Sequence, residues 1–409
     1  MMTIRMDKLI KVIATALDIV EGELLGASTY HGKRIAVLCA DMGRYMGMDT
    51  EGICGLTTCA LLHDNALTEY ILSERSGKKH DSAMQLHCEL GQHNVDSLNF
   101  QTDIRGFILY HHERADGSGP YSKRAGEVPL GAELIAIADS IDVTNHLQRV
   151  PIAALPNLRE AISKSIGETY TPRAAEAMLH VLEEKMLLSL QDDRILETAE
   201  QFIPLWSVDL ADQVILNLAQ LVTRIIDYKS TFTQCHSTQI ANKVWLMGGY
   251  YGYDPSQRVQ VFLAAALHDL GKLTTPLSIL EKPGALDADE FRIMKNHVAK
   301  TWELLKEVDG LETIRAWASN HHEKLDGTGY PFGKKADELD FNSRLMACID
   351  IYQAVSEERP YHPRRNHKDT MKILYTMVDK GQVDKNIVRD LDTVLACFSD
   401  QNVPAPSID

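Results

Sequence analysis

Histidine and aspartate residues recur in this 409-residue chain in an order and spacing that suit metal binding. The second half carries one set of seven such residues, which are His236, His268, Asp269, His297, His321, His322 and Asp350. The first half carries a matching set, which is His31, His63, Asp64, His87, His111, His112 and Asp139. Neutral imidazoles and carboxylates are ligands of divalent metal ions. Each half therefore holds the ligands of a candidate metal centre.

The spacing of the two sets indicates an internal duplication. The first interval is 32 residues in both halves (31 to 63 and 236 to 268), and the interval to the histidine pair is 24 in both (87 to 111 and 297 to 321). The text around the pairs also repeats, as HHERADGSG from residue 111 and HHEKLDGTG from residue 321. We interpret the chain as a tandem repeat, with one domain over residues 1–200 and a second over residues 201–409.

The elements that must position these residues are helices. Residues 261–267 form a nearly continuous apolar run that predicts a buried helix ending at His268. Asp287 and Glu290 resemble a capping box, and the helix it begins has an apolar stripe from Phe291 to Leu305. Period-two strand patterns are weak throughout. We predict an all-α fold with two tandem helical bundles, in which polar side chains converge on an apolar interior.

Seven ligand-type side chains exceed what one tetrahedral ion needs. Their number suits two octahedral ions that share a bridging carboxylate. Nitrogen and oxygen ligands without a thiolate favour iron or manganese, with nickel, cobalt and zinc as alternatives. Any one of these histidines could instead be a core residue bonded to a backbone carbonyl, but the repetition of the whole set argues for metal.

Charge and cysteine content restrict the function classes. The formal net charge is −15, which argues against a polymeric nucleic acid as partner. The seven cysteines are odd in number and form no C-x-x-C pair. We therefore expect no disulfide framework, and we expect the protein to be in a reducing compartment. No apolar stretch reaches membrane-spanning length and no signal-peptide pattern opens the chain. We expect a soluble cytoplasmic protein without a membrane partner.

From about Thr231 to the end, the second half resembles the HD-GYP family of metal-dependent phosphohydrolases. The motifs that carry this resemblance are His236-Ser237, HDLGKL from residue 268, His297, HHEKLDGTGYP from residue 321, Asp350 and Arg359-Pro360-Tyr361. The resemblance implies two tandem domains of the HD type, the first of them divergent. It also implies a phosphodiesterase that acts on a bacterial cyclic dinucleotide, either cyclic di-GMP or 3′,3′-cyclic GMP-AMP.

The resemblance also assigns roles to individual residues. It implies that His236, His268, Asp269 and Asp350 bind one ion, and that Asp269, His297, His321 and His322 bind the other. Asp269 would then bridge the ions, and Lys272 would contact the scissile phosphate, which makes these two the expected catalytic residues. The expected substrate-binding residues are Lys272, Asp326, Gly327, Tyr330, Pro331, Arg344 and Arg359.

Three positions depart from the family pattern. Phe232 stands where some members have a glutamate that binds a third metal, so we favour two ions. Gln353 replaces an acidic residue, and His362 replaces a basic one. These changes concern the positioning of the substrate rather than the metal centre.

The first half keeps all seven ligand-type positions and loses other parts of the pattern. Leu67 stands in place of Lys272, and Gly119-Pro120-Tyr121 has an inverted order relative to Gly329-Tyr330-Pro331. Loss of the cation favours a regulatory or scaffold domain that binds metal without efficient chemistry. Hydrolysis of a different phosphate ester, and histidines that serve only the core, are the alternatives.

The sequence therefore predicts an enzyme that hydrolyses a cyclic dinucleotide to the linear dinucleotide through hydroxide activated by two metal ions. A receptor that binds the cyclic dinucleotide without turning it over and signals through partner proteins is the alternative from another class. A general HD nucleotidase is a third candidate. A homodimer and a signalling-protein partner both stay open.

Overall fold

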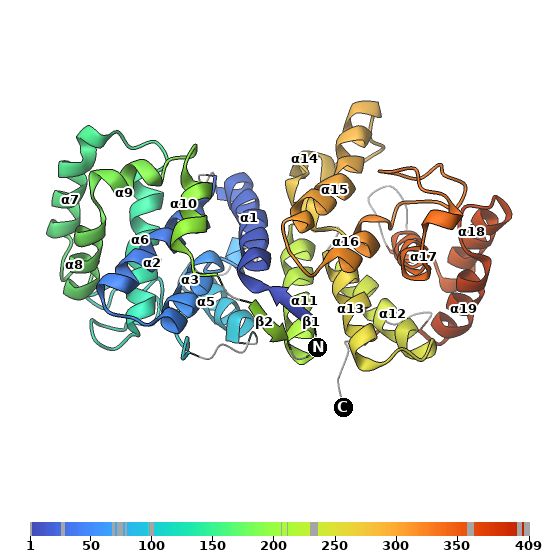
Figure 1. Ribbon diagram of the computed structural model, residues 1–409, viewed down its shortest axis with the longest axis horizontal. Coiled ribbons are helices and arrows are strands. Elements are labelled where there is room, and N and C mark those ends of the chain that lie inside the picture. The colour runs from blue at the N-terminus through green and yellow to red at the C-terminus, as the bar shows by residue number, and fades with distance from the viewer. Residues whose placement is uncertain are drawn as a thin grey trace. The chain divides into compact units, whose positions relative to one another are not determined.

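The computed structural model describes residues 2–25, 29–67, 70–71, 77, 80–96, 98, 102–205, 207–210, 212–229, 236–357, 364–398 and 403–404. It divides into two compact units, Arg5–Ser207 and Met1–Ile4 with Val208–Asp409 (Figure 1). This division falls between Ser207 and Val208, and the boundary at residue 200 stays a prediction. Thr231, Phe232, Arg359 and His362 lie outside the described residues.

The N-terminal unit is helical. Its helices are α1 (Met6–Leu25), α2 (His31–Tyr45), α3 (Thr50–Leu61), α5 (His80–Asp96), α6 (Leu130–Asn145), η1 (Ile152–Ala154), α7 (Leu155–Lys164), α8 (Pro172–Val181), α9 (Glu184–Ser189) and α10 (Ile195–Phe202).

The C-terminal unit repeats this plan. Its helices are α11 (Asp212–Tyr228), α12 (His236–Tyr250), α13 (Pro255–Leu267), η2 (Leu270–Thr274), α14 (Leu277–Leu280), α15 (Ala288–Lys306), α16 (Glu312–Ser319), η3 (Ala336–Glu338), α17 (Phe341–Ser356), α18 (His367–Asp379), α19 (Lys385–Leu395) and η4 (Ala396–Phe398). The all-α prediction is confirmed. Within the described residues, β1 (Met2–Arg5) and β2 (Ser207–Leu210) form one short two-stranded sheet, which the weak strand patterns did not predict. No described helix is long and apolar enough to cross a membrane.

The ligand-type residues occupy the same places in both helical plans. The first histidine begins α2 in one unit and α12 in the other. The His-Asp pair follows α3 after one residue, Leu62, and follows α13 directly. The third histidine lies within α5 or α15, and the last aspartate lies within α6 or α17. The sequence repeat is therefore also a structural repeat.

The local sequences of helices α13 and α15 explain how two of the ligand-type residues are positioned. In α13 the residues from Val261 to Leu267 are all buried, as the apolar run predicts, so the helix delivers His268 into the interior. The capping box of Asp287 and Glu290 at the start of α15 is confirmed. The apolar stripe of α15 is shorter than predicted, because Phe291 is 49% exposed and the Lys295 ammonium lies 4.9 Å from its ring centroid.

Close backbone contact holds the His-Asp turn against α15. A Cβ atom on Gly271 would lie 2.0 Å from the carbonyl oxygen of His297. The amide of Gly271 donates to Thr301 Oγ1, and Thr301 donates to the carbonyl of His268. Only glycine fits this contact, which joins the turn that carries Asp269 to the helix that carries His297.

We expect Gly271→Ala to lower the free energy of unfolding by about 1–3 kcal/mol, because the added methyl group overpacks a backbone contact. Chemical denaturation of the purified protein measures the change. Gly284→Ala is the matched control, since nothing lies within 4 Å of its added methyl group, and it should shift stability by about 0.5 kcal/mol or less. Equal stability of the two variants would contradict the contact.

Candidate metal centre

The C-terminal unit brings all seven ligand-type residues together in its interior. Their potential ligand atoms form two main groups, each lying within 4.8 Å. One group is His236, His268 and Asp350, and the other is His297, His321 and His322; a third group, His268, Asp269 and His321, overlaps both. The composition of the groups matches the two ion sites that the resemblance implies.

Asp269 lies between the two groups and presents one carboxylate oxygen to each. Its Oδ2 atom lies 3.1 Å from His268 Nε2 and 3.7 Å from His236 Nε2. Its Oδ1 atom lies 3.3 Å from His297 Nε2 and 3.9 Å from His321 Nε2. This is the arrangement of a bridging carboxylate.

Asp350 also lies between ligands of the two groups. Its Oδ1 atom lies 3.5 Å from His236 Nε2, and its Oδ2 atom lies 3.5 Å from His322 Nδ1. The two carboxylates therefore both lie among imidazoles, with five histidines around them.

Backbone carbonyls orient three of the imidazoles. The Nδ1 atoms of His268, His297 and His321 lie 2.6, 2.6 and 2.7 Å from the carbonyl oxygens of the residues three positions earlier, Ala265, Met294 and Ala318. When Nδ1 donates to a carbonyl, the lone pair of Nε2 points the other way, towards the centre, which is the usual support of a metal-binding histidine.

Buried atoms in the centre need a partner, and a cation would satisfy them. His268 Nε2 and Asp269 Oδ1 are buried, and among the described residues their short contacts with neighbouring polar atoms do not have the geometry of hydrogen bonds. Leaving buried polar atoms unpaired is costly. The residues thus fit divalent ions, and these His/Asp clusters could hold metal.

Sequence reasoning missed Glu357, which orients the imidazole of His236. Its Oε2 atom lies 2.8 Å from His236 Nδ1, and Gln353 Nε2 donates to its other oxygen. Gln353 in turn accepts a hydrogen bond of 2.5 Å from Lys243. The non-ionising Gln353 is therefore part of a chain of hydrogen bonds that ends on a ligand-type histidine.

In the N-terminal unit another carboxylate performs the role of Glu357. There Asp142, three residues after Asp139, lies 2.6 Å from His31 Nδ1. Gln353 holds the same place after Asp350 and cannot carry the charge, so a carboxylate one helical turn later, Glu357, performs this role.

Burial and charge determine the protonation of the centre. Burial lowers the pKa of His321, and it lowers the pKa of His322 to about 3, so both imidazoles are neutral and able to bind metal. Burial opposes charge on Asp269, yet neighbouring His268 and Lys272 hold its pKa well below the usual range. Burial also opposes charge on His236, but Glu357 and Asp350 raise its pKa to about 9.

Two of the predicted substrate residues lie at the centre. Lys272 Nζ lies 2.5 Å from Asp269 Oδ2, and its side chain is 17% exposed. The Tyr330 ring lies 4.8 Å from the His322 ring, centroid to centroid, and Pro331 follows it in the signature loop. Lys272 and Tyr330 therefore lie directly against ligand-type residues.

Two other predicted substrate residues support the loop. Asp326 accepts hydrogen bonds from the amide and hydroxyl of Thr328, and Gly327 has a positive φ of 78°, which favours glycine. Their substrate role stays a prediction, and Arg359 lies outside the described residues.

The contacts of Arg344 favour a structural role. Its guanidinium donates to the carbonyls of Leu339 and Ala336, and it lies 3.2 Å from Asp384 at the start of α19. Its substrate role also stays a prediction.

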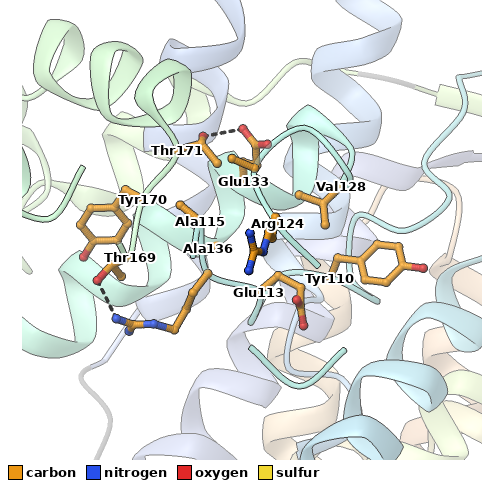
Figure 2. Close-up of a pocket in the computed structure, with 12 residues that line it drawn as sticks. Tyr110, Glu113, Ala115, Arg124, Val128, Glu133, Ala136, Thr169, Tyr170 and Thr171 are labelled. Atoms are coloured by element: carbon orange, nitrogen blue, oxygen red, sulfur yellow. Dashed lines mark hydrogen bonds between the residues drawn. The ribbon is translucent and has the colours of Figure 1, made fainter. Parts of the chain in front are cut away.

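The position that matches Arg344 in the N-terminal unit is Glu133, and the ion pair there has reversed charges. Glu133 accepts two hydrogen bonds from Arg173, near the start of α8, at 2.6 and 2.7 Å. Figure 2 shows Glu133 beside Thr171, which also donates to it. The acidic and the basic residue have changed places between the two copies, and the ion pair is kept. This indicates that the pair stabilises the packing of two helices, α6 with α8 in one copy and α17 with α19 in the other.

The N-terminal unit brings its own ligand-type residues together in a similar way. Asp64 presents Oδ2 to His63 Nε2 at 3.5 Å, and Oδ1 to His87 and His111 at 3.2 and 3.8 Å. Asp139 Oδ1 lies 3.2 Å from His31 Nε2 and 3.8 Å from His63 Nε2. Asp64 is thus placed like Asp269.

The loops after the two histidine pairs differ by one residue. Glu323 accepts from the amides of Phe332 and Lys334, nine and eleven residues later. Glu113 accepts from the amides of Tyr121 and Lys123, eight and ten residues later. The N-terminal loop is therefore one residue shorter, and the apparent inversion of tyrosine and proline is a deletion that removes the counterpart of Tyr330.

Comparison with known proteins agrees with this architecture. A model of the HD domain family matches residues 18–164 and 220–387, which is more than half of the chain. The chain belongs to the HD domain family and carries two HD domains in tandem. The resemblance inferred from the sequence is confirmed at this level.

Two relatives come from Vibrio cholerae serotype O1. The 3'3'-cGAMP-specific phosphodiesterase 1 is 27% identical over 92% of this chain and 88% of the relative. The 3'3'-cGAMP-specific phosphodiesterase 3 is 31% identical over 68% of this chain and 60% of the relative. A crystal structure of a cyclic GMP-AMP specific phosphodiesterase of V. cholerae aligns with a TM-score of 0.65 and 21% identity, over 96% of this chain and 98% of that one, which supports the fold.

We expect Glu357→Gln to weaken metal binding by about 10- to 100-fold, because the amide is a poorer partner for His236 Nδ1 than the carboxylate. Titration of the metal-free protein with Mn²⁺ measures the affinity. The control is Glu307→Gln, on the exposed end of α15, which should bind as the parent does. Unchanged affinity in Glu357→Gln would show that the contact does not support the metal centre.

Proposed function

We propose that the C-terminal domain, residues 201–409, is a metal-dependent phosphodiesterase that hydrolyses a cyclic dinucleotide to the linear dinucleotide. The observation that carries this proposal is the position of Asp269, whose two carboxylate oxygens face different buried imidazoles: Oδ2 faces His268 and Oδ1 faces His297. Such a carboxylate can hold two cations a short distance apart, which is the arrangement used for phosphoester hydrolysis.

Iron or manganese suits this centre best. The seven side chains offer only nitrogen and oxygen atoms, and no cysteine belongs to the described groups in this unit. Ligands of this kind suit manganese and iron, and soft metals prefer thiolates. Two divalent ions of this class are the proposed cofactors.

The residues around the centre can supply the other parts of the reaction. Ions bound by these ligands supply Lewis acidity and make water a stronger acid at neutral pH. Water adds to phosphorus, a P–O bond of the ring breaks, and the departing oxygen takes a proton to become a hydroxyl of the linear product. The Lys272 ammonium stabilises the negative charge that builds on the phosphate, while Glu357 and the backbone carbonyls keep the imidazoles in place.

The relatives support 3'3'-cGAMP as the first substrate to test. The two relatives described above are both named for this cyclic dinucleotide, and other relatives are named as cyclic di-GMP phosphodiesterases. The experiment compares the hydrolysis of both compounds by the purified chain with Mn²⁺ or Fe²⁺, with separation of the products by chromatography. Release of linear dinucleotide, faster from 3'3'-cGAMP, is the expected result. Tight binding without any product would instead identify a receptor.

We expect Lys272→Ala to lower turnover by about 100-fold or more, because a cation that stabilises the transition state is lost. Elemental analysis should find the metal content unchanged, since Lys272 is not a metal ligand. Lys300→Ala, at an exposed ion pair with Glu303, is the control and should keep full activity. Loss of metal from Lys272→Ala would refute the assigned role.

A further inference from the structure

A second cluster of potential ligands, with different chemistry, lies in the N-terminal unit. Its members are His87, Cys88, His111 and His112, and their potential ligand atoms all lie within 4.8 Å of one another. His87, Cys88 and His111 are buried, and His112 is half-buried. Three imidazoles and one thiol thus meet in the interior, where each needs a partner.

Cys88 is the chemical difference between the two copies. It directly follows His87, as Val298 directly follows His297 in the C-terminal copy. Val298 is fully buried and offers no ligand atom. The duplicated unit therefore has a sulfur atom at one centre and a hydrocarbon at the other.

The His87 ring is also held differently from its counterpart. His297 Nδ1 lies 2.6 Å from the Met294 carbonyl, whereas His87 Nδ1 is buried and has no hydrogen-bond partner among the described residues. In the same cluster, His111 Nε2 is likewise buried without a hydrogen-bond partner in the described part of this unit. These unpaired nitrogens, beside a thiol, are an independent indication of a bound cation.

The phosphate-facing lysine is replaced at this centre by an apolar side chain. The amide of Leu67 donates to the Asp64 carbonyl at 3.0 Å, as the amide of Lys272 donates to the Asp269 carbonyl at 2.8 Å. The backbone turn is therefore the same, and buried Leu67 stands where Lys272 stands in the other copy. Among the residues that the structure describes, the position of Lys272 thus holds no cation that could stabilise charge on a phosphate at this centre.

We propose that His87, Cys88, His111 and His112 bind a zinc ion through three nitrogens and one thiolate. A thiolate favours zinc over iron and manganese, and four protein ligands complete a tetrahedral site with no open position for water. The ion is structural, and the N-terminal domain, residues 1–200, serves a regulatory or scaffold role. The two halves of the duplication thus select different metals.

The test uses the full chain and a spectroscopic signal of the metal–sulfur bond. Replacing zinc by Co²⁺ should produce a thiolate-to-cobalt charge-transfer absorption in the near ultraviolet, which a centre of nitrogen and oxygen ligands does not give. Cys88→Val, which introduces the residue of the C-terminal copy, should abolish this absorption and lower the zinc content by about one ion per chain. Circular dichroism verifies that the variant is folded.

Two control variants make the result specific. Cys54→Ser changes a half-buried cysteine of α3 outside the cluster, and it should keep both the absorption and the zinc. Asp350→Asn alters the C-terminal centre and should leave the cobalt–sulfur absorption unchanged. Absence of the absorption from the parent protein, or its persistence in folded Cys88→Val, would overturn the proposal whether or not the C-terminal domain hydrolyses a cyclic dinucleotide.

Discussion

The structure depends on the buried carboxylate of Asp269. This carboxylate needs positive charge beside it, either from cationic side chains or from metal ions that the surrounding side chains bind. Asp269 is 1% exposed, and an isolated charge at such a position would be strongly unfavourable. Four imidazoles approach its two oxygens, and the Lys272 ammonium lies against one of them. Helices α12 and α15, the residue after α13, the short helix η2 and the turn after α16 supply these groups (Figure 1). The packing of the helices therefore also determines the chemistry of the centre.

Local backbone geometry orients most of the imidazoles described here. In both copies, the histidines after α3 and α13, and the first histidine of each pair, place Nδ1 near the carbonyl three residues earlier. Such a bond needs no distant partner. The first histidine of each set is different, because it begins a helix and depends on a carboxylate far along the chain. The copies supply it as Asp142 and as Glu357.

The two copies show how a duplicated centre can diverge without losing its fold. The ligand-type residues and the turns that carry them are kept, while the groups around them change: lysine to leucine, valine to cysteine, and a signature loop shorter by one residue. Each change affects what a bound ion could do, because ligand softness selects the metal and nearby cations stabilise developing charge.

The repeat, the seven-residue ligand sets, the helical class and the buried helix before His268 could all be predicted from the amino-acid order. These features follow from residue type and short-range periodicity, which are visible along the chain. The role of Glu357, the ion pair of Arg344 with Asp384 and the unpaired nitrogens of His87 could not be predicted in this way. They depend on contacts between side chains that are far apart in the sequence, in some cases by more than a hundred residues. They also depend on which of several available partners a long side chain contacts. Packing of the helices decides both, so only the folded arrangement reveals them.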